Sequence, residues 1–203
     1  LSGELPPVRW SIPLTNGRFG YLGMETGGGF LWTENARLRQ LTQWTNAPSG
    51  LRGPEQLELY LGERRWSLFA AQDGCKCRVS YGPGLIRWDK ELDVGMRAVV
   101  TAFVPPERCE RIFLLSLHGV PDGAHIQWRL EPLLGETPSH GLWVRTERAE
   151  HGIQFCNPIT GLCGWMMRSS VAPDEVKLPQ GRRYAAELTI PARENLLLQM
   201  GRM

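Results

Sequence analysis

Three carboxylates in the stretch DKELD are the residues whose spacing first suggests catalysis. Asp89, Glu91 and Asp93 alternate along five residues. On a strand they would share one face, with neighbours about 6.6 Å apart at ~3.3 Å per residue. Paired acids at such separations can serve glycoside hydrolysis. The alternative, a solvated acidic face beside Lys90 and Arg87, is the interpretation that we favour.

The histidines and cysteines form no recognisable metal or catalytic spacing. The four histidines are scattered without a His-x-His or His-x-x-x-His pair, and they are His118, His125, His140 and His151. The five cysteines, Cys75, Cys77, Cys109, Cys156 and Cys163, are odd in number and do not resemble a disulfide framework. A structural zinc needs four ligands, and the CKC pair has no second close pair. We therefore predict no metal and no cofactor, with Cys75 and Cys77 packing on one strand face, and a reducing, cytoplasmic location.

Glycine, tryptophan, arginine and asparagine are concentrated in GGGFLWTENARLRQLTQWTN, residues 27–46. Read by periodicity, the stretch begins as a strand and ends as a short helix. The three glycines could cradle an anion through their amides, but we favour a tight turn or a close backbone approach.

Tryptophan is unusually frequent, with eight residues spread over the chain. Tryptophan offers apolar area and an N–H group, which suits sugar-binding surfaces as well as cores. We assign six to the core and leave Trp32 and Trp44 as candidates for a binding surface, because their neighbours Asn35, Arg37 and Asn46 are polar. The six assigned to the core are Trp10, Trp66, Trp88, Trp128, Trp143 and Trp165.

Alternation of apolar and polar residues at period two predicts the elements that carry these side chains. HIQWRLE places Ile126, Trp128 and Leu130 on one face, and RYAAELTI places Tyr184, Ala186, Leu188 and Ile190 on one face. RAVVTAFV and RIFLLSLH are apolar on both faces, as central strands of stacked sheets are. No stretch keeps a helical apolar stripe for three turns. The sequence therefore predicts an all-β fold with more than one layer of sheet, a loop at 132–141 and a final strand at ENLLLQMGRM.

Composition excludes several function classes. The 203 residues carry a formal net charge of +2 with both signs interspersed, which argues against a nucleic-acid-binding face. No apolar run approaches the ~20 residues that span a bilayer. We interpret residues 1–203 as one domain, and the absence of an initiating methionine suggests a fragment of a longer enzyme.

The segment NGRFGYLGMETGGGFLWTENARLRQLTQWTN resembles the N-terminal domain of the family 94 glycoside phosphorylases. That family includes cellobiose and chitobiose phosphorylases and the C-terminal region of cyclic β-1,2-glucan synthases. The positions that match its signature are Asn16, Phe19, Gly20, Gly27, Gly29, Phe30, Trp32, Asn35, Arg37, Leu41, Thr42, Trp44 and Asn46. The likeness extends over about residues 7–200. Ala36, Leu38 and Ala47 depart from the signature, where the family commonly has Ser, Glu and Asp.

The resemblance implies an all-β, multi-sheet antiparallel β-supersandwich similar to the galactose-mutarotase sandwiches. It also implies that the general acid of the inverting reaction lies in a helical domain, which this chain does not contain. The expected function is therefore a non-catalytic, carbohydrate-associated domain of a β-glucan or disaccharide phosphorylase, or of a cyclic β-1,2-glucan synthase-type glycosyltransferase. No activity is expected of the chain alone.

The resemblance also sets the expected partners and contact residues. The partners are a helical catalytic domain of the same polypeptide, a β-glucan oligosaccharide and a second copy in a homodimer. The contact candidates are Trp32, Asn35, Arg37, Trp44 and Asn46, with Asn35 and Arg37 expected to hold the loop through planar hydrogen bonds. This loop could face the catalytic domain, a glucan or its own sandwich. Two rival functions stay open: a free-standing carbohydrate-binding module, and a mutarotase-like enzyme with a histidine and a carboxylate converging in a cleft.

Overall fold

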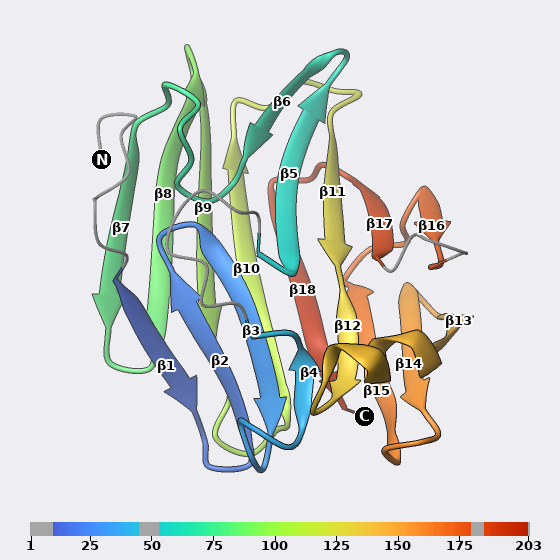
Figure 1. The fold of residues 1–203 in the computed structure, drawn as a ribbon. Helices are drawn as coiled ribbons and strands as arrows, with labels where there is room; N and C mark the ends of the chain where they lie inside the picture. Colours follow the sequence, from blue (N-terminus) through green and yellow to red (C-terminus); the bar gives the residue numbers. More distant parts are fainter. Residues whose placement is uncertain (1–9, 45–52, 180–184, 203) are drawn as a thin grey trace.

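The computed structural model describes residues 10–44, 53–179 and 185–202. These residues form three antiparallel sheets (Figure 1). The N-terminal sheet has the order β1 (Ser11–Thr15), β2 (Phe19–Met24), β3 (Gly27–Thr33), β4 (Gln40–Thr42) and β12 (Pro132–Gly135). A second five-stranded sheet has the order β16 (Glu175–Lys177), β17 (Ala186–Pro191), β11 (His125–Leu130), β5 (Glu55–Leu61) and β6 (Arg64–Ser67).

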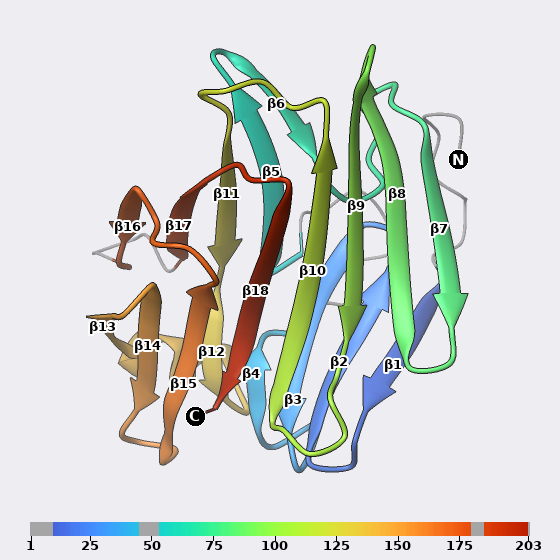
Figure 2. The same cartoon turned by 180° about the vertical axis from the view of Figure 1, so that it is seen from behind.

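The third sheet has eight strands and forms a layer of its own. Its order is β13 (Arg145–Ala149), β14 (Gly152–Asn157), β15 (Leu162–Ser169), β18 (Asn195–Arg202), β10 (Glu110–His118), β9 (Met96–Phe103), β8 (Leu85–Asp93) and β7 (Cys77–Gly82). Figures 1 and 2 show the two five-stranded sheets side by side against one face of this layer. The predicted all-β supersandwich, with more than one layer of sheet, is confirmed.

The core lies between the layers, and period-two alternation explains which side chains fill it. Ile126, Trp128 and Leu130 are buried on β11, as the sequence predicts. On β17, Ala186, Leu188 and Ile190 are buried too, while Tyr184 lies outside the described residues. The strand predicted at the C-terminus is β18.

A buried ion pair crosses this core between the layers. The Arg111 guanidinium on β10 donates two hydrogen bonds to the Glu55 carboxylate on β5, at 2.6 and 2.7 Å. The indole N–H of Trp128 donates to the same carboxylate at 2.8 Å. The guanidinium also lies 3.4 Å from the centroid of the Phe113 ring. Since an unpaired buried charge is costly, loss of either Arg111 or Glu55 would leave the other as an uncompensated charge in the core.

Among glycines 27–29, Gly29 permits the close approach of β3 to this pair. All three have positive φ, at 85°, 77° and 80°, which favours glycine. A Cβ on Gly29 would lie 2.4 Å from the Cβ of Glu55. The prediction that the glycines serve a close backbone approach is confirmed.

Three other sequence predictions about local structure are wrong. The segment after β3 forms a turn over 34–39 and then the short strand β4, where a helix was expected. Residues 132–141, expected as a loop, contain β12 and the start of the 3₁₀ helix η1 (Pro138–Trp143).

Trp10 and Trp143, assigned to the core, are 69% and 58% exposed. Trp143 belongs to η1, which buries no residue, and Trp10 precedes the edge strand β1. The other four tryptophans assigned to the core are buried.

Candidate interaction surface

The outer face of the N-terminal sheet carries the largest aromatic side chains of the 27–46 stretch. On β3, Leu31 and Thr33 are buried toward the core. Phe30 and Trp32 alternate with them and therefore point to the opposite, outer face. On β2 and β1, Leu22 and Pro13 lie in register with Phe30 and continue the apolar row.

The aromatic rings on this face pack against one another. Phe30 stacks on Trp32, with 5.1 Å between ring centroids, and meets Trp44 edge-on at 5.0 Å. Trp32 lies so close over Gly20 that a Cβ there would be 2.1 Å from its ring. Trp32 is half-buried and Trp44 is 41% exposed. We call the set Pro13, Leu22, Met24, Phe30, Trp32 and Trp44 the aromatic face.

The turn that follows β3 is held by the side chain of Asn35. Its Oδ1 accepts hydrogen bonds from the backbone N–H groups of Arg37 and Leu38, both at 2.9 Å. Such a bond from an asparagine to the backbone two and three residues on is the usual way in which this residue fixes a turn. Arg39 closes the turn with an ion pair to Glu34 at 3.2 Å.

Arg37 contributes to this turn through its backbone only. Its side chain is exposed, and its guanidinium makes no hydrogen bond or ion pair with any residue that the structure describes. Its carbonyl accepts from the Gln40 amide at 3.0 Å. The clamp expected of the Arg37 side chain is therefore not found among the described residues, which leave the five donors of its guanidinium without a partner.

A group of exposed apolar side chains lies on loops beside the edge of the N-terminal sheet. Leu38, Leu142, Trp143 and Ile159 are 52–63% exposed. The loops are tied together by the buried Asn157, whose amide donates to the carbonyls of Leu134 and His140 at 3.0 and 2.9 Å. Gln40 also reaches the Glu136 carbonyl, at 3.4 Å. These apolar groups are thus presented on a hydrogen-bonded framework of loops.

The structure brings four of the five contact candidates to one region. Trp32 and Trp44 meet through Phe30, while Asn35 and Arg37 lie in the turn that leaves the same strand. Asn46 lies outside the described residues. Phe30 was not chosen as a contact residue from the sequence, although its alternation with Leu31 and Thr33 places it on the face of Trp32.

Comparison with known proteins decides the family. The model of the glycosyl hydrolase 94 supersandwich domain matches residues 2–120, more than half of the chain. The chain belongs to this family. No curated protein matches the sequence.

The fold of this supersandwich domain also resembles solved structures. A bacterial glucoamylase in complex with acarbose matches with a TM-score of 0.54 at 7% sequence identity. The match covers 98% of this chain and 34% of the glucoamylase chain, so the domain spans about a third of that enzyme's length. At this identity the likeness shows the fold alone.

Two of the three carboxylates of β8 in the supersandwich domain, Asp89 and Asp93, are held by arginines. Asp89 accepts two hydrogen bonds from Arg97, at 2.7 and 2.5 Å, and these bonds hold the pKa of the Asp89 carboxyl below its usual value. A hydrogen bond from the Val94 backbone, followed by the ion pair with Arg64 at 2.6 Å, lowers the pKa of Asp93. A general acid needs a raised pKa, so neither group suits that role. The favoured interpretation of a solvated acidic face is consistent with this geometry.

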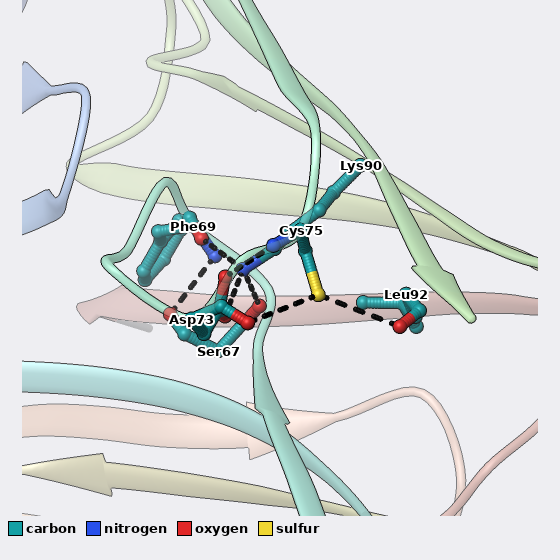
Figure 3. A network of polar contacts seen from close by, with 6 residues as sticks. All are labelled: Ser67, Phe69, Asp73, Cys75, Lys90 and Leu92. Carbon is teal, nitrogen blue, oxygen red and sulfur yellow. Dashed lines mark hydrogen bonds and ion pairs between the residues drawn. The ribbon is translucent and has the colours of Figure 1, made fainter. Parts of the chain in front are cut away.

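The sequence predicts Lys90 beside these acids on a solvated face, and the structure contradicts this placement. Lys90 points to the opposite face of β8 and is fully buried. Its ammonium donates to the carbonyls of Ser67 and Phe69, at 2.8 and 3.0 Å, and to the Asp73 carboxylate at 2.5 Å (Figure 3). All three donors of the ammonium are used, which fixes the loop between β6 and β7.

The cysteines differ from the prediction at one pair. Cys156 and Cys163 form a disulfide across the β14–β15 hairpin, whereas no disulfide framework was expected. Cys75 and Cys77 are not part of this disulfide, and burial raises the pKa of both thiols, that of Cys77 to about 11. Among the described residues, no group of three or more metal-binding side chains forms a metal site. Within the same residues no helix is long and apolar enough to cross a membrane. The cytoplasmic location stays a prediction.

Proposed function

We propose that this supersandwich domain is a non-catalytic part of a glycoside phosphorylase or a cyclic β-1,2-glucan synthase-type glycosyltransferase, and that its aromatic face docks a helical catalytic domain of the same polypeptide. The single observation that carries this proposal is the aromatic face, which lies on the outer side of a sheet whose following turn presents Arg37, a residue with no side-chain partner in the described part of the chain. Its partner would be the domain that supplies the general acid.

The composition of the aromatic face favours a protein partner over a sugar. Sugar sites combine rings with several polar groups, whereas the aromatic face consists of apolar side chains whose only polar groups are the indole N–H groups of Trp32 and Trp44. Phe30 is buried beneath its neighbours, so the half-buried Trp32 and the exposed Trp44 provide the aromatic area, which suits the apolar centre of a protein interface. The exposed Leu142 and Trp143 on η1 would extend the contact beyond the sheet edge.

Arg37 provides the polar part of this contact. Its guanidinium has no partner among the described residues, and arginine is the cation best suited to bidentate bonding of a carboxylate. A carboxylate or a set of helix C-terminal carbonyls on the catalytic domain would satisfy it. Arginine and tryptophan are also the residue types most often found to dominate binding energy in protein interfaces.

The chemistry of the domain supports a non-catalytic role. Inverting attack by phosphate needs a general acid facing an in-line nucleophile. Asp89 and Asp93 on β8 are engaged by Arg97 and Arg64, which favours the ionised form of these two carboxylates. Glu55 is enclosed in the core with Arg111.

The test begins with the reading frame that encodes the chain. We expect it to continue past Met203 into a helical region with an acidic catalytic motif. The chain alone should release no glucose 1-phosphate from cellobiose or sophorose with inorganic phosphate, whereas the longer polypeptide should release it. A stop codon after Met203, or phosphorolysis by the pure chain, would overturn the proposal.

A further inference from the structure

The outer face of the second five-stranded sheet differs in character from the aromatic face. Its central strands alternate strictly, with Leu57, Leu59, Ile126 and Trp128 buried. Between these residues, polar and planar side chains point outward, and all are half-buried: Glu58 and Tyr60 on β5, His125, Gln127 and Arg129 on β11, and Glu187 on β17. We call these six residues the polar platform.

Two rings of the polar platform lie parallel to each other. Tyr60 and His125 are direct cross-strand partners. Their ring centroids are 5.2 Å apart, and the ring planes differ by only 5°. The Tyr60 hydroxyl donates to Glu58 at 2.9 Å. The imidazole nitrogens of His125 make no hydrogen bond with any residue that the structure describes, so they are available to a ligand.

Amide and carboxylate groups lie in the cross-strand row next to the rings. Glu58 and Gln127 are register partners, and Gln127 donates to the Glu187 carboxylate at 2.8 Å. Partners in such a row are about 5 Å apart. Flat rings beside a row of planar donors and acceptors are the groups that recognise the apolar faces and the hydroxyls of a sugar.

The charges of the polar platform point to a neutral ligand. Arg129 pairs with Glu131 at 2.7 Å, and Glu58 is offset by Arg65, which lies across from Tyr60 on β6. Lys177 also pairs with Glu187, at 2.8 Å. A nucleic acid would require an excess of positive charge. A protein interface would require an apolar centre, which these six residues do not provide.

We propose that the polar platform binds a neutral oligosaccharide, with the Tyr60–His125 pair as its ring contact and Gln127 as a hydrogen-bonding contact. This site is separate from the aromatic face, and it does not depend on the docking proposed above. It would give the domain an affinity for glycan of its own.

Titration of the isotopically labelled chain with β-1,2- and β-1,4-linked glucotetraose, followed by NMR, tests this proposal. We expect shifts at β5 and β11 with a dissociation constant of about 1 mM, in the range of weak recognition. His125→Ala and Gln127→Ala should each weaken binding at least tenfold. Both side chains lie on the outer face, so the melting temperature should change little.

Two variants of other surfaces serve as controls. Tyr81→Ala removes an exposed tyrosine from β7 of the eight-stranded sheet, and it should leave binding unchanged. Trp44→Ser removes a ring from the aromatic face and should leave it unchanged as well. No shifts at 20-fold the expected dissociation constant, or shifts that His125→Ala and Gln127→Ala do not reduce, would overturn the proposal. Shifts lost only in Trp44→Ser would assign sugar binding to the aromatic face and would contradict both proposals.

Discussion

Single residues decide how closely the two five-stranded sheets approach each other. Gly29 has a φ of 80°, and its missing Cβ leaves room for Glu55, which pairs with Arg111 in the core. The sequence predicted that the glycines serve a turn or a close approach. It could not identify Glu55 as the group approached, because the residues that surround Glu55 come from strands far apart in the chain.

Alanine at Gly29 should destabilise the domain more than alanine at Gly62. Both glycines have positive φ, so both variants incur the backbone cost of roughly 1–2 kcal/mol. At Gly62 no atom lies within 4 Å of the added Cβ, whereas at Gly29 the Cβ overlaps Glu55. We expect a further loss of about 1–3 kcal/mol at Gly29 from overpacking. Urea unfolding of the two variants measures this difference, and equal losses would contradict the close approach.

Tyr21 should make the domain sensitive to alkaline pH. Its phenol is fully buried and donates to the Gly27 carbonyl at 2.9 Å, and burial raises its pKa well above the ordinary value. A pKa that is higher in the folded state gives stability that is complete below pH about 10, the ordinary tyrosine pKa, and is lost as pH rises beyond it. Above pH 10, the free energy of unfolding should therefore fall less steeply in Tyr21→Phe than in the parent chain. Parallel curves would show that Tyr21 ionises without penalty.

At the scale of elements, the turn over 34–39 contains one residue that holds the turn together, Asn35, and one whose side chain could bind a partner, Arg37. Asn35 fixes the turn through two hydrogen bonds to the backbone, while the Arg37 side chain has no described partner. Both residues match the family signature, so the sequence could not distinguish a residue that shapes the loop from one that the loop presents. The distinction needed the position of each side chain.

The two residues of this turn should respond differently to truncation. Asn35→Ala removes two hydrogen bonds and should lower the free energy of unfolding by about 1 kcal/mol. Arg37→Ala should change it by no more than about 0.5 kcal/mol, as is usual for a surface residue without partners. Thermal melts of both variants decide this, and a lower midpoint in Arg37→Ala would restore the structural role first expected of it.

At the scale of the whole molecule, the sequence predicted the architecture better than the surfaces. In a segment such as HIQWRLE the apolar residues alternate, so burying one face of the strand fixes which side chains enter the core. The strands and the presence of more than one layer could therefore be predicted from the sequence. Trp10 and Trp143 show the limit of this approach, because composition cannot say whether a tryptophan lies between two layers or beyond an edge strand. The polar platform depends on β5, β11 and β17, which are distant in sequence and which the sequence alone could not place in register.

The two outer faces divide the proposed roles of the domain. The aromatic face lies on the N-terminal sheet and the polar platform on the neighbouring sheet, and both five-stranded sheets belong to the same layer (Figure 1). A domain that docks its catalytic partner through one sheet could hold glycan on the other. The docking is the central claim, since the expected function depends on it.

That claim is tested most directly by phosphorolysis in the longer polypeptide that the proposal expects, with Arg37→Ala and Trp44→Ser compared with the exposed control Val94→Ser. We predict that Arg37→Ala and Trp44→Ser each lower the rate of glucose 1-phosphate release at least tenfold. The chain carrying Arg37→Ala should keep its melting midpoint, and the control should keep full activity. Unchanged rates in both variants would contradict docking through the aromatic face.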